Sequence, residues 1–208
     1  MSVRDVTNRL KKYLWKVSGD SSKPIVFVGS SIIALWKSLP RYFPGTRILN
    51  TAVCGAQTGD ILARLDELVI DHEPWAVCYY CGSNDINSPI PVDTIIANIL
   101  ETHHRLSRQL PNLKFVYLSI IRAPQKKDRW HLVDQVNLAV QQHSTTRRDF
   151  RFIDINPVFF NHDSSPRLDF YEEDQLHLTA KGYAALGAYL APIIRLDVGL
   201  QATRPDAP

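Results

Sequence analysis

Residues 25–36 read IVFVGSSIIALW, an apolar run followed by a glycine, two serines and a second apolar run. The unbroken apolar residues from Ile25 to Val28 are typical of a strand that is buried on both faces of a sheet. Gly29 allows a sharp turn, and the apolar pattern from Ile32 onward fits a helix better than a second strand. The stretch therefore predicts a strand, a tight turn and a helix, with Ser31 at or just before the helix start.

The same alternation continues along the chain. We expect further strands over residues 47–53, 75–81, 114–121 and 151–155, and helices over residues 4–16, 60–70, 92–110, 129–145 and 179–194. Thr179 is a candidate cap for the last helix. The alternation predicts an α/β fold with a mostly parallel sheet and helices on both of its faces. We expect one domain over residues 1–200 and a disordered tail over residues 201–208.

Composition narrows the classes of function. The 208-residue chain is 45% hydrophobic and 22% charged, with a net charge of +3. Its Lys and Arg residues are scattered, so no nucleic-acid partner is expected. No apolar run has the length of a membrane span, so we expect no membrane insertion. The first residues lack the apolar segment of a signal peptide, and the small, odd set of three cysteines suits a reducing compartment. These features favour a cytoplasmic location.

Two of the cysteines, Cys78 and Cys81, form a C-x-x-C pattern within an expected strand. Residues three apart on a strand face opposite sides of the sheet. A shared metal or a disulfide is therefore disfavoured, and we interpret both as small buried hydrophobic residues.

Four candidate site residues follow the carboxyl ends of expected strands: Ser31, Gly55, Asn84 and Arg122. In open parallel sheets, ligands bind at this edge of the sheet. The topology therefore gathers these separate segments on one rim.

Each rim residue has a functional and a purely structural interpretation. Ser31 is either a nucleophile or the cap of the helix that follows it. Gly55 is either a backbone N–H donor to a ligand or a simple turn glycine. Asn84 is either an amide donor to an oxyanion or the first residue of an Asx turn. The residue types alone leave these alternatives open.

His177 is the candidate general base, with Asp174 three residues before it. This spacing within a turn could let the carboxylate accept from one ring nitrogen while the other faces a serine. The alternative for His177 is a surface or capping residue before the last helix. His162 is a reserve candidate, and Asp85 fits a local acceptor better than a catalytic acid. The histidines show no metal-ligand spacing, so no metal is expected.

Taken together, four segments resemble the four sequence blocks of the SGNH hydrolases, also called the GDSL esterase/lipase superfamily. They are FVGSSI at residues 27–32, NTAVCG at 50–55, YCGSNDI at 80–86 and DQLHLTAKGY at 174–183. They occur in the family's order and with familiar spacing, and the resemblance extends from about residue 24 to residue 194. It is strongest to the compact members, which include platelet-activating-factor acetylhydrolase-like and carbohydrate-esterase-like proteins.

The resemblance implies a flavodoxin-like three-layer α/β/α sandwich with five parallel strands. It also implies a catalytic triad of Ser31, His177 and Asp174, and an oxyanion hole formed by the N–H groups of Ser31 and Gly55 and the side chain of Asn84. No cofactor is implied. The chain has Ser30 where the family most often has Asp, which bears on the hydrogen bonds around the nucleophile turn rather than on the triad itself.

The expected activity is hydrolysis of small-molecule carboxylic esters with short acyl chains. Arg122, Trp130, Phe170 and Tyr171 lie in expected rim loops, where each could touch the substrate or pack on the body of the protein. Arg122 could favour an acidic or phosphorylated leaving group.

Other functions stay open at this point. Within the family they are a carbohydrate O-acetylesterase, a lysophospholipase or thioesterase, and a catalytically silent protein that binds acylated glycans or a partner protein. Outside it, a flavin-binding module of flavodoxin type is disfavoured because the glycines and hydroxyls after the first strand are too sparse for a phosphate cradle.

Overall fold

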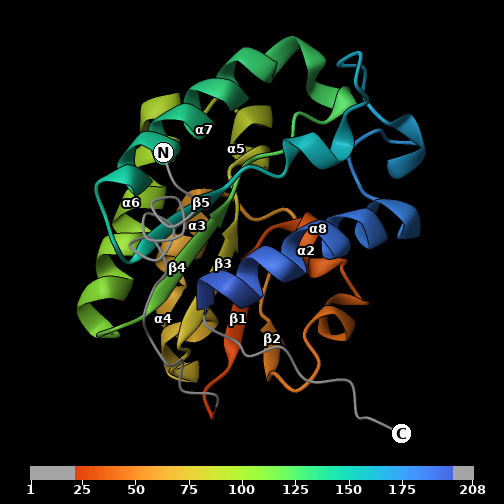
Figure 1. Ribbon diagram of the computed structural model, residues 1–208. Helices are drawn as coiled ribbons and strands as arrows, with labels where there is room; N and C mark the ends of the chain where they lie inside the picture. Colours follow the sequence, from red (N-terminus) through yellow and green to blue (C-terminus); the bar gives the residue numbers. More distant parts are fainter. Residues whose placement is uncertain (1–21, 199–208) are drawn as a thin grey trace, which may run out of the picture.

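The computed structural model describes residues 22–198. The helix expected over residues 4–16 and the tail expected from residue 201 lie outside these residues. Within the described part, one sheet of five strands is all parallel, in the order β2-β1-β3-β4-β5 (Figure 1). The strands are β1 (Ile25–Gly29), β2 (Ile48–Asn50), β3 (Ala76–Tyr80), β4 (Lys114–Leu118) and β5 (Phe150–Ile153). The expected parallel α/β fold is confirmed.

The edge strand β2 is shorter than the strand expected over residues 47–53. It ends at Asn50, whose side chain accepts a hydrogen bond from the backbone N–H of Ala52 (3.2 Å). Such local bonds compete with the regular ladder of a sheet. The N–H groups of Thr51 and Val53 still donate to the carbonyls of Phe27 and Gly29, at 2.9 Å each. The loop that follows β2 therefore stays fixed beside the end of β1.

Helices follow each of the first four strands. The α-helices are α2 (Ser31–Ala34), α3 (Thr58–Ala63), α4 (Leu65–Leu68), α5 (Ser83–Asn87), α6 (Val92–Gln109), α7 (Trp130–Thr145) and α8 (Ala180–Val198). Short 3₁₀ helices are η1 (Leu39–Tyr42), η2 (Ile70–His72), η3 (Pro124–Arg129), η4 (Asn156–Phe159) and η5 (Leu168–Phe170). Thr179 caps α8, since its hydroxyl accepts from the N–H of Gly182 (3.2 Å).

The single helix expected over residues 60–70 is wrong in two respects. The helix begins earlier, at Thr58, because Gln57 and Asp60 form a capping box. It is then interrupted at Arg64 (φ −107°, ψ 23°) and at Val69 (φ −136°, ψ −56°). Leu65 and Val69 are nevertheless fully buried, so each short piece still packs on the sheet.

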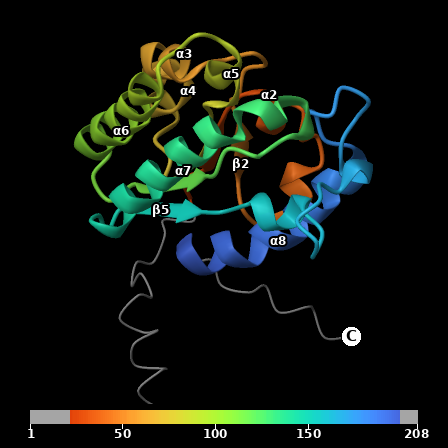
Figure 2. The same ribbon diagram turned by 90° about the horizontal axis from the view of Figure 1, so that it is seen from above.

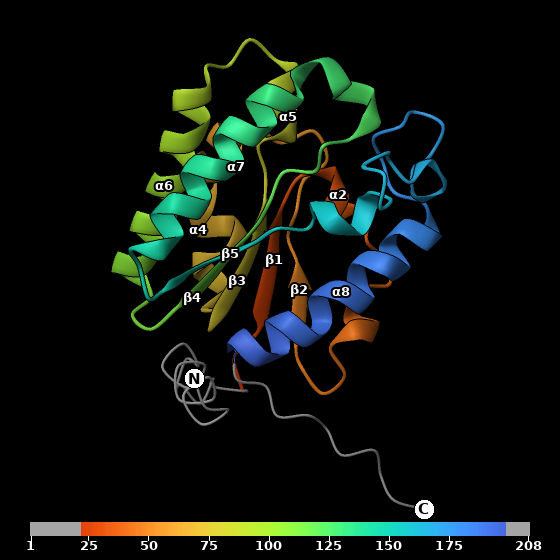
Figure 3. The same cartoon turned by 45° about the horizontal axis from the view of Figure 1, so that its top comes forward.

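Two cores form on the two faces of the sheet. On one face, side chains of α2 and α8 pack against the strands. On the other, α3, α4, α6 and α7 do so (Figures 2 and 3). Cys78 belongs to the first core and Cys81 to the second, as expected for residues three apart on a strand. The three-layer arrangement expected from the sequence is thus confirmed.

The strand order reverses at β1, which lies between β2 and β3. A crevice at the carboxyl ends of the strands forms at such a switch point. Gly29 ends β1 there with a φ of 143°, and a Cβ on it would lie 1.8 Å from the carbonyl oxygen of Tyr80. The N–H of Ser30 donates to the same carbonyl (3.0 Å). Only glycine allows β1 and β3 to approach this closely just before Ser31.

Candidate active site

Ser31, His177 and Asp174 are brought together although Ser31 and His177 lie 146 positions apart in the sequence. Ser31 is the first residue of α2, directly after β1. Its Oγ lies 3.0 Å from Nε2 of His177, and Nδ1 of His177 lies 2.5 Å from Oδ2 of Asp174. Ser31 and His177 are half-buried and Asp174 is exposed. The three side chains form a continuous hydrogen-bonded relay that is open to solvent.

The protonation of this relay follows from its geometry. A carboxylate only accepts hydrogen bonds, so the proton of a neutral His177 ring lies on Nδ1, and Nε2 accepts from the hydroxyl of Ser31. Burial raises the pKa of Asp174, but hydrogen bonds from the N–H groups of His177 and Leu176 and from the His177 ring outweigh it and lower the pKa below its usual value. Asp174 is therefore a carboxylate at neutral pH.

Two backbone donors lie at the same edge of the sheet. As the first residue of α2, Ser31 has an N–H without an acceptor inside the helix. Gly55 lies in the loop after β2 with a φ of 79°, and a Cβ there would meet nothing within 4 Å. Within residues 22–198, its N–H has no hydrogen-bond partner. Both groups are free to bind a ligand atom.

Asn84 lies at the start of α5 and carries an amide donor at the same edge of the sheet. Its Nδ2 donates to the carbonyl of Ala56 (2.9 Å), next to Gly55. An amide NH₂ has two protons, so the second remains for a ligand. The bond to Ala56 thus ties Asn84 to the loop that contains Gly55, although the two residues follow different strands.

Asp85 is a structural hydrogen-bond acceptor, as the sequence indicates. The residue that donates to it, however, lies far away in the sequence. It is buried and accepts from both the N–H (3.0 Å) and the hydroxyl (2.6 Å) of Thr58 at the start of α3. Gln57 adds a second link, since its Nε2 donates to Oγ of Ser88 (2.7 Å). These bonds fix the Gly55 loop against α5.

Comparison with known proteins identifies the family of this chain. A model of the GDSL-like Lipase/Acylhydrolase family matches residues 27–185. The chain belongs to this family. The resemblance to the SGNH or GDSL hydrolases noted in the sequence is confirmed, and the protein is therefore a member of a family of ester hydrolases. Among curated proteins, no sequence matches this chain.

Solved structures share the fold of this GDSL-like protein. A protein from Streptococcus pneumonia proposed to be a platelet activating factor is 21% identical, with a TM-score of 0.74, over 93% of this chain and 100% of its own. A proposed acylhydrolase from Bacteroides fragilis is 19% identical, with a TM-score of 0.75, over 95% and 99%. A catalytic mutant of an acetylxylan esterase from Geobacillus stearothermophilus is 17% identical, with a TM-score of 0.69, over 88% and 98%. At these identities the similarity establishes the fold alone.

The four residues for which the sequence left open either substrate contact or packing divide into two pairs in this GDSL-like chain. Arg122 and Trp130 are half-buried. The guanidinium of Arg122 lies 5.8 Å from the ring centroid of Trp130 and 4.9 Å from that of Phe160. Phe170 and Tyr171, in contrast, are only 2% and 5% exposed. Both aromatic side chains turn into the core, where their apolar area is buried.

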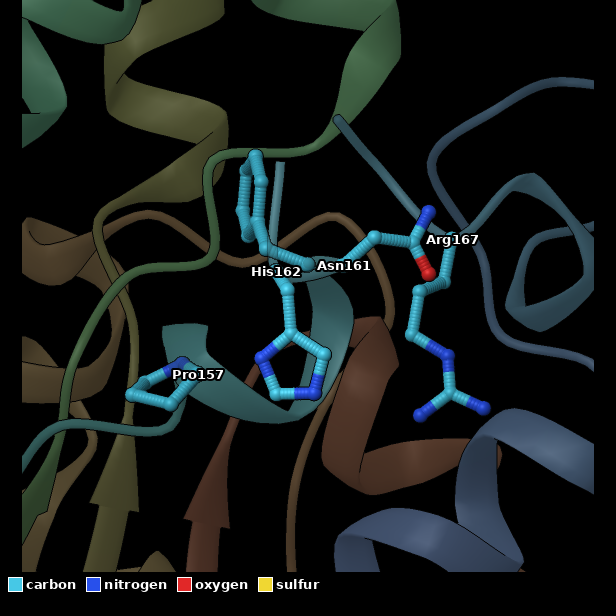
Figure 4. A pocket seen from close by; sticks show the side chains of 5 residues that line it. Pro157, Asn161, His162 and Arg167 are labelled. Carbon is cyan, nitrogen blue, oxygen red and sulfur yellow. The ribbon is translucent and has the colours of Figure 1, made fainter. Parts of the chain in front are cut away.

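A cavity of about 410 Å³ lies in the loop after β5 (Figure 4). It is lined by Pro157, Phe160, Asn161, His162 and Arg167. His162, the reserve candidate for the base, belongs to this cavity, whereas His177 contacts Ser31. The Phe160 ring both lines the cavity and contacts Arg122.

The described residues show neither a metal cluster nor a membrane span. No three His, Cys, Asp or Glu side chains in residues 22–198 are grouped so that they could hold a metal ion. No helix in the same range has both the length and the apolar composition needed to cross a bilayer.

Sequence reasoning did not identify two contributors to the site. Thr58 lies two residues before the helix expected from residue 60, and nothing in its local sequence points to Asp85, its partner 27 positions away. Lys126 is fully buried, with hydrogen bonds to Ser83, and no sequence pattern distinguishes it from its exposed neighbour Lys127. Both act over long sequence separations.

Proposed function

We propose that this protein is a serine esterase that hydrolyses short-chain carboxylic esters through a Ser31–His177–Asp174 triad. The observation that carries this proposal is the relay from Ser31 Oγ to His177 Nε2 (3.0 Å) and from His177 Nδ1 to Asp174 Oδ2 (2.5 Å). A helix cap needs none of these partners, and Ser31 in fact follows Ser30 at the capping position. The same geometry is what nucleophilic acyl transfer requires.

In the first step, Oγ of Ser31 attacks the ester carbonyl while Nε2 of His177 takes its proton. Asp174 holds the ring in the orientation and tautomer that leave Nε2 free, and it stabilises the imidazolium that forms. His177 then gives the proton to the leaving alcohol. The product is an acyl group bound to Ser31 Oγ.

The negative charge that develops on the carbonyl oxygen is held by the N–H groups of Ser31 and Gly55 and by Nδ2 of Asn84. Donors fixed before the reaction stabilise this charge without reorganising. In the second step, His177 removes a proton from water, which attacks the acyl group and releases the acid. Ser31 regains its proton, so no external cofactor enters the cycle.

The substrate is proposed to be a small, water-soluble ester. The triad is solvent-accessible, since Asp174 is exposed and Ser31 and His177 are only half-buried. An open site of this kind suits short acyl chains better than long ones, which need extended apolar burial.

The test is hydrolysis of p-nitrophenyl acetate, butyrate and octanoate by the wild type and by Ser31→Ala. Ser38→Ala is the matched control, because Ser38 lies directly before the short helix η1 and its side chain makes no capping bond. We expect Ser31→Ala to lose the enzymatic rate and Ser38→Ala to retain it. Equal rates in wild type and Ser31→Ala would show that Ser31 is only part of the helix start.

The chain-length profile tests the proposed substrate class separately. We expect kcat/KM to fall from acetate to octanoate. A rising profile, with Ser31 still essential, would keep the serine esterase mechanism and replace the short-chain substrate by a long-chain one.

A further inference from the structure

The segment η3 connects the two halves of the proposed active site. The N–H of Gln125 donates to the carbonyl of Gln175 (3.1 Å), which lies in the turn that carries the catalytic acid and base. The next residue, Lys126, points the other way, and its Nζ donates to the carbonyl (3.0 Å) and to Oγ (2.7 Å) of Ser83. Arg129 then donates to the carbonyl of Ile86 (3.2 Å). Adjacent residues of one short segment therefore hold the acid–base turn and both ends of α5.

Lys126 is unusual because it is a buried lysine without a carboxylate partner. Its side chain is 1% exposed, and within residues 22–198 it makes no ion pair. The backbone leaves helical geometry at this residue (φ −118°, ψ 35°), within an otherwise helical segment whose neighbouring Lys127 is exposed. A buried charge without an opposite charge is costly. A methionine would fill the same space without this cost. The stability of the fold therefore does not explain why a lysine occupies this position.

The residue that Lys126 holds comes directly before Asn84. Ser83 is the first residue of α5, which spans only Ser83–Asn87. A helix of this length is not stable by itself, so the direction of the Asn84 amide depends on what anchors α5. One anchor is the bond between Asp85 and Thr58 (2.6 Å) on the side of the Gly55 loop. Lys126 is the anchor on the side of η3.

We propose that Lys126 is a positioning residue for the reaction, which holds the Asn84 amide in line with Ser31 through its two hydrogen bonds to Ser83. The inference rests on the proposed esterase function. Oxyanion stabilisation depends on donor distances within a few tenths of an ångström. Loss of the Lys126 anchor lets α5 shift and weakens the donation from Asn84, while substrate binding in the ground state is unchanged.

The test is a double-mutant cycle between Lys126→Met and Asn84→Ala, with p-nitrophenyl acetate as the substrate. Lys126→Met keeps the length and apolar part of the side chain and removes the donors. We expect it to lower kcat by about 10- to 100-fold, part of the loss caused by removing an oxyanion donor altogether, with KM changed less than about threefold. In the Asn84→Ala background, the same substitution should lower kcat by less than about threefold, because the group it positions is gone.

Lys127→Met is the matched control and should keep the wild-type kcat, since Lys127 is exposed. Equal fold losses from Lys126→Met in both backgrounds, or no loss in the wild-type background, would overturn the proposal. If Lys126→Met does not fold, as judged by its thermal transition, Ser83→Ala takes its place in the cycle and the same outcomes decide.

Ser31→Ala is measured in the same series. If wild-type activity survives in Ser31→Ala, the proposed esterase mechanism itself fails. If Ser31→Ala is inactive while Lys126→Met retains the full kcat, only the role of Lys126 fails. The two failures are therefore distinct.

Discussion

Asp174 holds His177 through both the backbone and the ring. Oδ1 of Asp174 accepts the N–H of His177 (2.9 Å), and Oδ2 accepts Nδ1 of its ring (2.5 Å). The same Oδ1 also accepts the N–H of Leu176 (2.9 Å). One carboxylate thus closes the turn and orients the imidazole ring that the turn carries. At a spacing of three residues, one side chain reaches both the backbone N–H and the ring of His177.

Asp174→Asn separates these tasks. The amide oxygen can still accept from the backbone, but an NH₂ group that faces the ring favours the tautomer with its proton on Nε2, which cannot accept from Ser31. We expect kcat to fall by about 10³–10⁴-fold with little change in the thermal transition. The control is Asp163→Asn, whose carboxylate likewise accepts within an exposed turn, from Ser165 (2.9 Å). A kcat above a tenth of the wild-type value would contradict the role of Asp174.

Asn84→Ala tests the side-chain donor. Its removal should lower kcat by about 10²–10³-fold, because the developing charge loses one of its fixed donors, and KM should change little. Steady-state kinetics with p-nitrophenyl acetate measure this. Asn87→Ala is the control, since Asn87 lies on the same helix α5 and is exposed. A negligible effect of Asn84→Ala would leave its bond to Ala56 as its main role.

The fold, and the edge of the sheet that carries the candidate site, could be predicted because the sequence patterns that indicate them are local. A continuous apolar run such as residues 25–28 indicates a strand buried on both faces, and the parallel topology then places Ser31 and Asn84 at one edge. The Asp174–His177 pair was visible because its two members lie in one turn.

What the sequence could not reveal depends on contacts between distant segments. The bonds of Asp85 to Thr58 and of Lys126 to Ser83 span 27 and 43 positions. The inward direction of Phe170 depends on the core that its loop meets, and not on the loop's own residues. The amino-acid sequence of such a loop shows the same pattern whether a given side chain is exposed or buried.

Gly29→Ala should destabilise the protein strongly. The new Cβ would lie 1.8 Å from the carbonyl oxygen of Tyr80, and the residue would keep a φ of 143°. The strands must separate to relieve this contact, so we expect a loss of at least about 3 kcal/mol in the free energy of unfolding. Urea unfolding measures it.

Gly59→Ala is the control, because its Cβ would meet only Nδ2 of Asn98 at 3.7 Å, and in helix α3 it should be neutral or stabilising. Equal stability of the two variants would contradict the close approach of β1 and β3.

Lys126→Met should raise stability at pH 7, although we expect it to lower kcat. Burial, together with the nearby charge of Arg129, lowers the pKa of Lys126 from 10.5 to about 8. Between these values the unfolded chain binds more protons than the folded one, so the wild type gains stability as the pH rises through this window. Below it, the buried charge costs up to about 3 kcal/mol.

Urea unfolding at pH 7 and pH 10.5 should show that Lys126→Met is more stable than the wild type, by a margin that shrinks as the pH rises. An advantage independent of pH would mean that burial of the charge is not its cause.

Arg122→Ala should distinguish anionic from neutral esters. The side chain of Arg122 is 37% exposed, and its ion-pair partner Asp134 is 3.8 Å away, so part of the guanidinium remains accessible to a ligand. Its contact with Phe160 places it beside the cavity lined by His162 and Arg167. We expect kcat/KM for an ester that carries a free carboxylate to fall about two- to fivefold, the effect of one half-exposed charge, while that for p-nitrophenyl acetate stays unchanged. Arg148→Ala, an exposed arginine beyond the end of α7, should change neither value. A parallel loss for both esters would assign Arg122 to packing on Trp130 and Phe160 and not to recognition of an anionic substrate.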